Sequence, residues 1–328
     1  MLLLYILRRI AWSIPLLFAV SLIAFALISA PPGDYITSFA AALSESGDVV
    51  DQARLDALRA RYGLDQPFLV QYWSWISNAV RGDFGISFEW QQPVSTLIWE
   101  RMSLSVMLAL ATLLFTWALA LPIGIYSAVR KYSIGDYIVT TIGFLGLATP
   151  NFLLALVLMY IAVVHFGADV SGLFSNEFQD APWSWAKFVD LLKHLWIPVV
   201  ILGTSATASL VRIMRANLLD ELHRPYVTTA RAKGLSEFRL IMKYPVRIAI
   251  NPFVSTIGWA FPQLISGAVI TAVVLSLPTA GPLMLQALLA QDMYLAGAFI
   301  LLLCCLSIIG MLVSDILLAV IDPRIRFR

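Results

Sequence analysis

The chain reads Tyr226-Val-Thr-Thr-Ala-Arg-Ala-Lys-Gly-Leu-Ser236 between two long apolar stretches. This segment is polar, basic and helix-prone. Gly234 is a stop signal for a helix that begins near Arg224 or Pro225. A short basic helix that joins two apolar stretches predicts a docking surface, on which a partner can push a protein that has no motor of its own.

The composition places the chain in a lipid bilayer. Hydrophobic residues make up 60% of the 328 residues, charged residues make up 13%, and the mean hydropathy is +0.83, which excludes a water-soluble globule. A helix needs about 20 apolar residues to cross roughly 30 Å of hydrocarbon, and the apolar runs lack the alternation of membrane β-strands. We therefore predict an all-α membrane protein with six transmembrane helices, at residues 10–30, 103–128, 137–166, 195–219, 253–277 and 293–320.

The placement of Lys and Arg sets the orientation of these spans. With both termini in the cytoplasm, basic residues fall mainly in the inner segments and acidic residues mainly in the outer ones. Arg8 and Arg9 flank the first span, which lacks a small-residue cleavage site and is expected to be a retained anchor. The two cysteines, Cys304 and Cys305, are adjacent inside the last span, so neither a disulfide framework nor a metal cluster is expected.

Residues 31–102 form a long outer segment in which we predict two amphipathic helices. Asp48 is a candidate cap for the first helix, Gly63 closes it, and Pro67 favours the start of the second. We expect their apolar faces to lie against the membrane or a partner subunit. These faces comprise Leu55, Leu58 and Tyr62 in the first helix, and Phe68, Tyr72, Trp75, Ile76 and Ala79 in the second. The predicted divisions are an N-terminal tip and first span at residues 1–30, the outer segment at 31–102, and a five-helix core at 103–328 with a cytoplasmic loop at 220–247.

Prolines interrupt several spans. Each proline frees a carbonyl and favours a kink, which is tolerated where neighbouring helices or cavity water satisfy the backbone. We expect the stretches Gly146-Leu-Ala-Thr-Pro150 and Phe261-Pro262 to be breaks that move or face a pathway, although any single kink can equally serve packing. The candidate pathway or gate residues are Pro150, Asn151, Trp259, Pro262 and Gln263.

The sequence contains no recognisable catalytic set. Its three histidines, His165, His194 and His223, lie in separate segments, and there is no His-Glu-x-x-His pair, no Gly-x-Ser-x-Gly elbow and no Gly-x-x-x-x-Gly-Lys-Ser/Thr loop. If ATP is used, another subunit must bind it. An ion-coupled secondary carrier or channel is the alternative from another class, but such carriers usually hold mid-membrane carboxylates. Only Asp315 is a candidate, and we expect it to be structural.

The order of residues in the basic segment resembles the cytoplasmic motif of importer-type ABC permeases, which opens with Glu-Ala-Ala and places a Gly six residues after the Glu. Here Thr228-Thr229-Ala230 stands for the triplet and Gly234 for the glycine, and Thr229-Ala-Arg-Ala-Lys-Gly-Leu235 looks like the peptide-permease version. The chain therefore resembles the B-type inner-membrane permeases of dipeptide, oligopeptide and nickel importers. Other matching motifs are Leu7-Arg-Arg9, Ala30-Pro-Pro-Gly-Asp34, Tyr62-Gly-Leu-Asp-Gln-Pro67, Arg81-Gly-Asp-Phe-Gly85, Pro122-Ile-Gly124 and Asp322-Pro-Arg-Ile-Arg326.

This resemblance implies a type I importer permease fold with a helical periplasmic insertion after the first span, in a bacterial or archaeal inner membrane. It implies a homologous second permease, two cytoplasmic ATPase subunits or domains that bind ATP and Mg, and a periplasmic or lipid-anchored substrate-binding protein. The permease itself would catalyse no reaction, bind no cofactor and contact no nucleic acid.

The same resemblance implies that residues 221–236 form a coupling helix seated in a cleft of the ATPase. Gly234→Asp and Ala230→Asp are then expected to uncouple ATP hydrolysis from transport while leaving membrane insertion intact. The coupling residues implied are Glu221, Arg224, Tyr226, Thr228, Thr229, Ala230, Lys233, Gly234 and Leu235.

One departure from the family pattern bears on the substrate. Such permeases often carry Gly-Ala-Val-Val-Val-Glu in the fifth span, whereas this chain reads Gly267-Ala-Val-Ile-Thr-Ala272. Intramembrane carboxylates are costly and usually functional, so the missing Glu removes a possible contact for a charged peptide amine. The resemblance still favours di- or oligopeptides as the solute, with oligosaccharides or another small neutral solute as the alternative.

Overall fold

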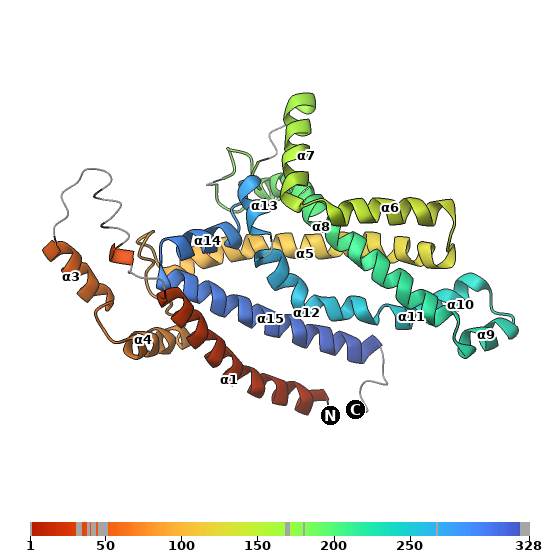
Figure 1. Ribbon diagram of the computed structural model, residues 1–328, viewed down its shortest axis with the longest axis horizontal. Coiled ribbons are helices and arrows are strands. Elements are labelled where there is room, and N and C mark those ends of the chain that lie inside the picture. Colours follow the sequence, from red (N-terminus) through yellow and green to blue (C-terminus); the bar gives the residue numbers. More distant parts are fainter. Residues whose placement is uncertain are drawn as a thin grey trace. The chain divides into compact units, whose positions relative to one another are not determined.

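The computed structural model describes residues 2–30, 35–37, 40, 44, 52–167, 171–179, 181–266 and 268–321. Within these residues the regular elements are helices, apart from one isolated antiparallel bridge between Ile86 and Pro93 (Figure 1). The helices are α1 (Leu2–Ser29), α3 (Gln52–Tyr62), α4 (Phe68–Val80), α5 (Val94–Val129), α6 (Ile134–Ala148), α7 (Asn151–Phe166), α8 (Trp185–Leu222), α9 (Pro225–Ala232), α10 (Glu237–Lys243), α11 (Pro245–Ala249), α12 (Asn251–Ser266), α13 (Val269–Val274), α14 (Ala280–Leu289) and α15 (Met293–Ile321).

The chain forms two compact units. We call them the core unit, which comprises Met1–Leu2, Val106–Pro278 and Ser307–Arg328, and the N-terminal unit, which comprises Leu3–Ser105 and Thr279–Leu306. Helices α5 and α15 each contribute residues to both units. The N-terminal unit therefore combines the first span and the outer segment with a distant stretch of the chain, a pairing that the sequence pattern did not indicate.

Four described helices are long and apolar enough to cross a membrane: α5, α8, α15 and the Ile6–Ser29 part of α1. They correspond to four of the six predicted spans. Helices α6 and α7 are a fifth candidate if the pair counts as one span, because together they are apolar enough but are bent by 101° at the break between them.

The break between α6 and α7 lies where the sequence predicted it. Thr149 ends α6 in an extended conformation, with φ −88° and ψ 119°, and Pro150 precedes the first residue of α7. A proline disfavours the helical conformation for the residue before it and has no N–H to donate. The predicted span at residues 137–166 is therefore two helices that meet at a sharp corner.

The predicted single helix at residues 253–277 is wrong. Helix α12 ends at Ser266, and the short helix α13 follows from Val269. Pro262 lies inside α12, so the break comes after this proline and not at Phe261-Pro262 as expected. Gly267, which lies outside the described residues, follows α12 in the sequence, and glycine is a poor helix former.

Helix α8 is central to the core unit, where it contacts α6, α7, α11 and α12 and runs beside α5 and α6 (Figure 1). Glycines allow the closest approaches. A Cβ atom on Gly124 of α5 would lie 2.6 Å from Cβ of Met214 on α8, and one on Gly310 of α15 would lie 3.2 Å from the carbonyl oxygen of Gly258 on α12. Small residues at helix contacts suit a bilayer protein, because helices in lipid associate by close packing and not by hydrophobic burial.

A buried ion pair fastens α6 to α8 in the core unit. The side chain of Asp136, near the start of α6, is 3% exposed. Arg215 of α8 donates from Nε to Asp136 Oδ1 at 2.9 Å and from Nη2 to Oδ2 at 2.8 Å. The hydroxyl of Ser127 and the backbone N–H of Tyr132 also donate to this carboxylate. The turn between α5 and α6 is thereby fixed to the C-terminal part of α8, about two turns before that helix ends at Leu222.

Helices α3 and α4 confirm the two helices predicted in the outer segment. Helix α3 ends before Gly63, which has the left-handed φ of +68°, and α4 begins directly after Pro67. Asp48, the expected cap of the first helix, lies outside the described residues, as does the side chain of Tyr62. Leu55 of α3 is buried.

The apolar face of α4 packs against α1 inside the N-terminal unit. The rings of Tyr72 and Trp75 lie 5.6 and 5.7 Å from the ring of Phe25, and the hydroxyl of Tyr72 lies 2.8 Å from that of Ser21. Our expectation that this face lies against the membrane or a partner subunit is therefore wrong for these residues. Helical periodicity identified the face but not the helix that covers it.

A buried carboxylate joins two distant segments of the N-terminal unit. Asp292 precedes α15 and caps it by accepting the backbone N–H of Leu295 at 3.1 Å. It also accepts the hydroxyl of Ser87 at 2.6 Å and the backbone N–H of Phe88 at 2.8 Å. Burial raises the pKa of Asp292, and these hydrogen bonds oppose that effect.

We predict that Gly124→Ala destabilises the protein by about 1–3 kcal/mol, because the added Cβ meets the Cβ of Met214, which cannot move without its helix backbone. Gly143→Ala is the matched control, since Gly143 of α6 also faces α8 but its Cβ would lie an ordinary 3.8 Å from Ala208. Thermal unfolding of the purified protein in detergent measures both variants. Equal unfolding temperatures would contradict this packing.

Candidate functional site

Helix α9 forms from the basic segment as the sequence predicted. Helix α8 ends at Leu222, Arg224 is extended with φ −71° and ψ 146°, and Pro225 takes the first helical position, where its missing N–H costs nothing. The helix stops at Lys233. Gly234 follows with φ +78° and no other atom within 4 Å of the Cβ position, so glycine is required there by the backbone and not by crowding.

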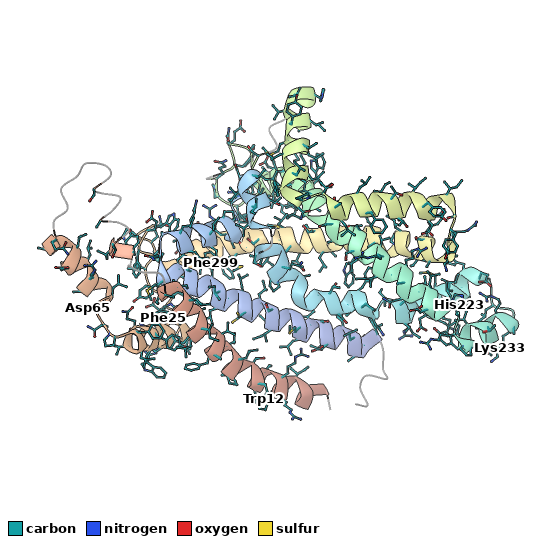
Figure 2. The ribbon with its side chains drawn as sticks, in the orientation of Figure 1. Trp12, Phe25, Asp65, His223, Lys233 and Phe299 are labelled. Carbon is teal, nitrogen blue, oxygen red and sulfur yellow. The ribbon has the colours of Figure 1, made fainter. Side chains whose placement is uncertain are left out.

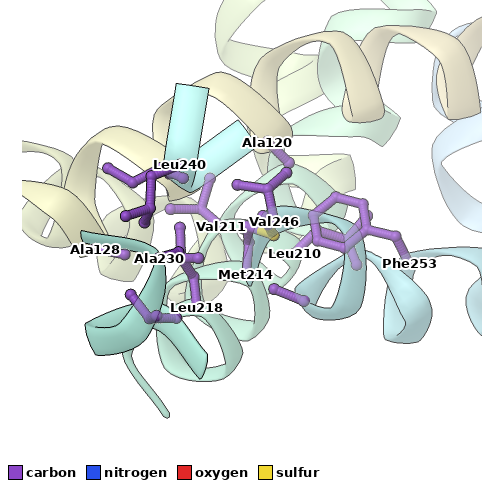
Figure 3. Packing of buried hydrophobic residues seen from close by; sticks show 13 residues of the cluster. Ala120, Ala128, Leu210, Val211, Met214, Leu218, Ala230, Leu240, Val246 and Phe253 are labelled. Atoms are coloured by element: carbon purple, nitrogen blue, oxygen red, sulfur yellow. The ribbon is translucent and has the colours of Figure 1, made fainter. Parts of the chain in front are cut away.

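A hydrophobic cluster holds α9 against the core unit (Figure 3). Val227 and Ala230 are the buried residues of α9, at 0% and 8% exposure. They belong to one cluster with Leu218 of α8, Leu240 of α10 and Ala128 of α5. Full burial of a valine side chain contributes about 1.5–3 kcal/mol relative to its exposure. Helix α9 is thus one rigid piece with the ends of α5 and α8.

An ion pair closes the turn after α9. Arg231 donates from Nε and Nη2 to the two carboxylate oxygens of Glu237, at 2.5 and 3.1 Å, across the turn that contains Gly234. The arginine lowers the pKa of Glu237, and the glutamate raises the pKa of Arg231. Both side chains are about half exposed, so water screens the pair and its main effect is to fix the direction of the turn.

The exposed side chains on and next to α9 form a polar surface, which we call the α9 surface. Figure 2 shows Lys233 at one end of the core unit. The exposed residues of the α9 surface are Arg224, Thr228, Thr229, Arg231, Lys233 and Gly234. The surface is basic and lies at the tip of α8, where a partner can reach it.

The predicted coupling residues do not all share this surface. Arg224, Thr228, Thr229, Lys233 and Gly234 are exposed, Ala230 is buried, and Glu221, Tyr226 and Leu235 are half-buried. Glu221 accepts a hydrogen bond from the Tyr226 hydroxyl at 2.5 Å and lies 3.7 Å from Nε of Arg224. Glu221 and Tyr226 therefore fasten the start of α9 to the end of α8.

A second feature of the core unit is a cavity of about 330 Å³ between α5, α8 and α12, which we call the polar cavity. Asn151 at the start of α7 and Gln263 of α12, two of the predicted pathway residues, both line it. None of the described lining residues carries a charge. The other polar lining residues are Thr112 and Thr116 of α5, Ser205 and Ser209 of α8, and Thr256 of α12.

Two other predicted pathway residues are sequence neighbours of residues that line this cavity but do not line it themselves. Pro150 directly precedes Asn151, and Pro262 directly precedes Gln263. The backbone of Trp259 belongs to α12, but its side chain lies outside the described residues. The structure thus brings together two of the four candidates whose side chains it describes.

Sequence reasoning missed the hydroxyl residues of the polar cavity. Thr112 and Thr116 are four residues apart in one apolar helix, as are Ser205 and Ser209 in another, and this spacing places each pair on one helix face. This four-residue spacing is the signal in the sequence that could have identified these hydroxyl residues. The hydroxyl of Thr116 is buried without a hydrogen-bond partner in the described part of the chain.

Among the described residues, no group of three His, Cys, Asp or Glu side chains could hold a metal ion. Asp315 is half-buried in α15, and Ala272, at the position of the missing family glutamate, is buried in α13 and does not line the polar cavity.

Comparisons with known proteins cover nearly the whole chain. A family described as binding-protein-dependent transport system inner membrane component matches residues 120–327, and the corresponding N-terminal family matches residues 1–109. The chain is 34% identical over 327 residues to the oligopeptide transport system permease protein AppB of Bacillus subtilis, covering 98% of this chain and 99% of that protein. It is 32% identical over 340 aligned residues to the dipeptide transport system permease protein DppB of Escherichia coli K12, covering 99% of each. A putative peptide permease protein of Brucella ovis is 34% identical over 324 residues, covering 98% of each.

The burial of Ala230 changes the expected result of one variant. Ala230→Asp places an unpaired carboxylate in the hydrophobic cluster, so we now expect lower stability and not intact insertion with lost coupling. Thr229→Asp is the control, because it adds the same charge one residue earlier on the exposed side. We expect membrane levels to fall several-fold for Ala230→Asp and to stay near wild type for Thr229→Asp, as measured by immunoblot and by thermal unfolding. Similar losses in both variants would contradict the orientation of α9.

Proposed function

The chain belongs to the family of inner-membrane components of binding-protein-dependent transport systems, and we propose that it is the permease subunit of an ATP-binding cassette importer for di- or oligopeptides. The observation that carries the proposal is the exposed α9 surface on a helix that a hydrophobic cluster joins rigidly to α8. Because α8 also lines the polar cavity, a single helix connects a docking surface to a pathway.

Coupling would work through this shared helix. Ser209, which lines the polar cavity, and Leu218, which packs under α9, are nine residues apart on α8, a rise of about 14 Å. When two ATPase subunits bind ATP and close, a docked α9 would be carried with them and would displace α8. The shift between inward-open and outward-open states is limited by how differently the ATPases bind the two states.

The polar cavity suits a solute that is bound by hydrogen bonds. The amides of Asn151 and Gln263 can donate to carbonyl oxygens and accept from N–H groups, which are the repeating groups of a peptide backbone. The hydroxyls of Thr112 and Thr256 already donate to backbone carbonyls of their own helices and can accept from N–H groups. Sugar hydroxyls could pair with the same side chains, so oligosaccharides remain the alternative cargo. The relatives named as oligopeptide and dipeptide permeases favour peptides.

We propose six spans with both termini in the cytoplasm. The four long helices supply four spans, the bent pair α6 and α7 supplies another, and α12 with α13 supplies the sixth. Helix α12 alone would measure about 24 Å, too short for roughly 30 Å of hydrocarbon, so α13 is needed to complete it. This arrangement places residues 31–102 as a periplasmic insertion and the α9 surface in the cytoplasm, in agreement with the basic residues around α9.

The assembly would contain three further kinds of subunit. A homologous second permease would complete the pathway, two ATPase subunits or domains would bind ATP and Mg, and a periplasmic or lipid-anchored binding protein would deliver the peptide. Uptake by the reconstituted assembly, measured with labelled dipeptides and oligosaccharides side by side, tests the function. Transport by this polypeptide alone without an ATPase would overturn the proposed function. Uptake of oligosaccharides but not of dipeptides would identify the cargo as an oligosaccharide.

We predict that Lys233→Glu lowers peptide-stimulated ATP hydrolysis of the assembly at least about ten-fold. A reversed charge in a docking interface costs several kcal/mol, whereas Lys233 is exposed and its loss leaves the fold intact. Lys193→Glu, an equivalent reversal on an exposed lysine near the opposite end of α8, should leave hydrolysis unchanged. Normal coupling in Lys233→Glu would count against docking at α9.

We also predict that Asn151→Ala combined with Gln263→Ala lowers peptide uptake at least about five-fold and up to about 160-fold, since two lost hydrogen bonds to neutral groups, at about 0.5–1.5 kcal/mol each, are together worth about 1–3 kcal/mol. Basal ATP hydrolysis should persist because neither residue lies near α9. Asn78→Ala changes an exposed amide of α4 and serves as the control. Wild-type uptake in the double variant would exclude this cavity from the pathway.

A further inference from the structure

A groove of about 450 Å³ lies in the core unit, and Leu147 is the one described residue that lines both this groove and the polar cavity. Three helices form its walls: α5, α6 and α8. The walls are apolar over most of their length, with Phe115 and Ile123 on α5, Ile142 and Leu147 on α6, and Val211 on α8. Ile142 is 63% exposed, so the groove opens to the surroundings of the helices and not only to the interior of the unit.

One end of the groove is basic. Arg212 and Arg215 of α8 line it there, and Arg130 and Lys131 lie in the adjacent turn between α5 and α6. Asp136 engages Nε and Nη2 of Arg215, which leaves Nη1 for another acceptor. Arg212 is exposed and has no carboxylate partner among the described residues. This end of the groove therefore has more positive than negative charge.

The length of the groove matches one leaflet of a bilayer. On α8 the lining residues recur every three or four positions from Thr204 to Arg215. Eleven residues of helix rise by about 16 Å, close to half of the roughly 30 Å hydrocarbon thickness. Leu147, just before the break between α6 and α7, lines the groove as well, and α6 runs antiparallel to this part of α8, because Asp136 pairs with Arg215 and Gly146 faces Thr204. The groove thus extends from the basic ends of the helices to the level of that break.

We propose that this groove binds an anionic phospholipid of the cytoplasmic leaflet, with one acyl chain along the apolar walls and the headgroup phosphate at Arg212 and Nη1 of Arg215. The proposal rests on the membrane orientation proposed above, which places the basic end at the cytoplasmic surface. Basic pockets between transmembrane helices at that surface are a recurring form of lipid recognition. The groove differs from the polar cavity in that its walls offer few groups to a hydrogen-bonding cargo.

The positive charge at the basic end of the groove favours a lipid over a neighbouring helix as the occupant. A helix of a second permease could cover the apolar walls, but it would leave Arg212 at the edge of hydrocarbon without an anion unless it carried a carboxylate there. A phosphodiester supplies that anion and the chain together. Arginine binds phosphate oxygens through two N–H groups, which adds geometric specificity.

The test is native mass spectrometry of the intact transporter titrated with phosphatidylglycerol, and in parallel with phosphatidylcholine of the same chains. We expect tighter binding of phosphatidylglycerol and about five-fold weaker binding in Arg212→Gln, the effect of one basic side chain at an anionic surface. Arg239→Gln is the matched control, since Arg239 is also exposed but lies outside the groove. Thr207→Leu, which fills the groove and removes a buried hydroxyl without a described partner, should weaken binding through the acyl chain.

The proposal would be overturned by equal affinity for the two lipids, by unchanged phosphatidylglycerol binding in Arg212→Gln, or by binding of glycerophosphoglycerol as strong as that of the intact lipid. A photocrosslinker at Ile142 that captures the second permease in place of lipid would do the same. Thermal unfolding of each variant separates lost binding from lost folding. Because the readout is lipid binding and not uptake, its failure leaves the proposed transport function to be judged by its own experiments.

Discussion

The bidentate ion pair between Arg215 and Asp136 fixes the arrangement of three helices in the core unit. It joins the α5–α6 turn to the C-terminal part of α8, and the carboxylate receives further hydrogen bonds from Ser127 and Tyr132. Removal of one partner from a buried pair leaves an uncompensated charge, which costs about 3–5 kcal/mol. With α5, α6 and α8 fixed in register, the groove takes its walls from these three helices, and α5 and α8 also contribute to the polar cavity and to the hydrophobic cluster beneath α9.

Side chains with different roles follow one another along helix α8. Ser205 and Ser209 face the polar cavity, Arg215 holds the ion pair, and Leu218 packs beneath α9. A protein interior is close-packed and transmits displacement with little compression. The cluster that contains Val227 and Leu240 packs α9 directly against α8. A displacement of α9 is therefore expected to displace α8 as well.

Local signals in the sequence predicted the boundaries of several elements correctly. Pro225 and Gly234 fix the ends of α9, Gly63 closes α3, and Pro150 marks the corner between α6 and α7, because each acts on its own backbone. The pattern could not tell which neighbour covers a helix face. Ala230 was therefore assigned to the docking side although it is buried, and the apolar face of α4 was assigned to lipid or a partner although α1 covers it. The pathway residues Asn151 and Gln263 were found through their prolines, whereas the hydroxyls opposite them needed the three-dimensional arrangement of α5 and α8.

The corner at Thr149 and Pro150 has a consequence for solvent. A helix end leaves carbonyl groups, and a helix start leaves N–H groups, without intrahelical partners, and hydrocarbon cannot satisfy either. Because α6 and α7 meet at 101° beside Asn151, which lines the polar cavity, we expect water in that cavity to bond to these backbone groups. Water at that depth would raise the local dielectric constant inside the core unit.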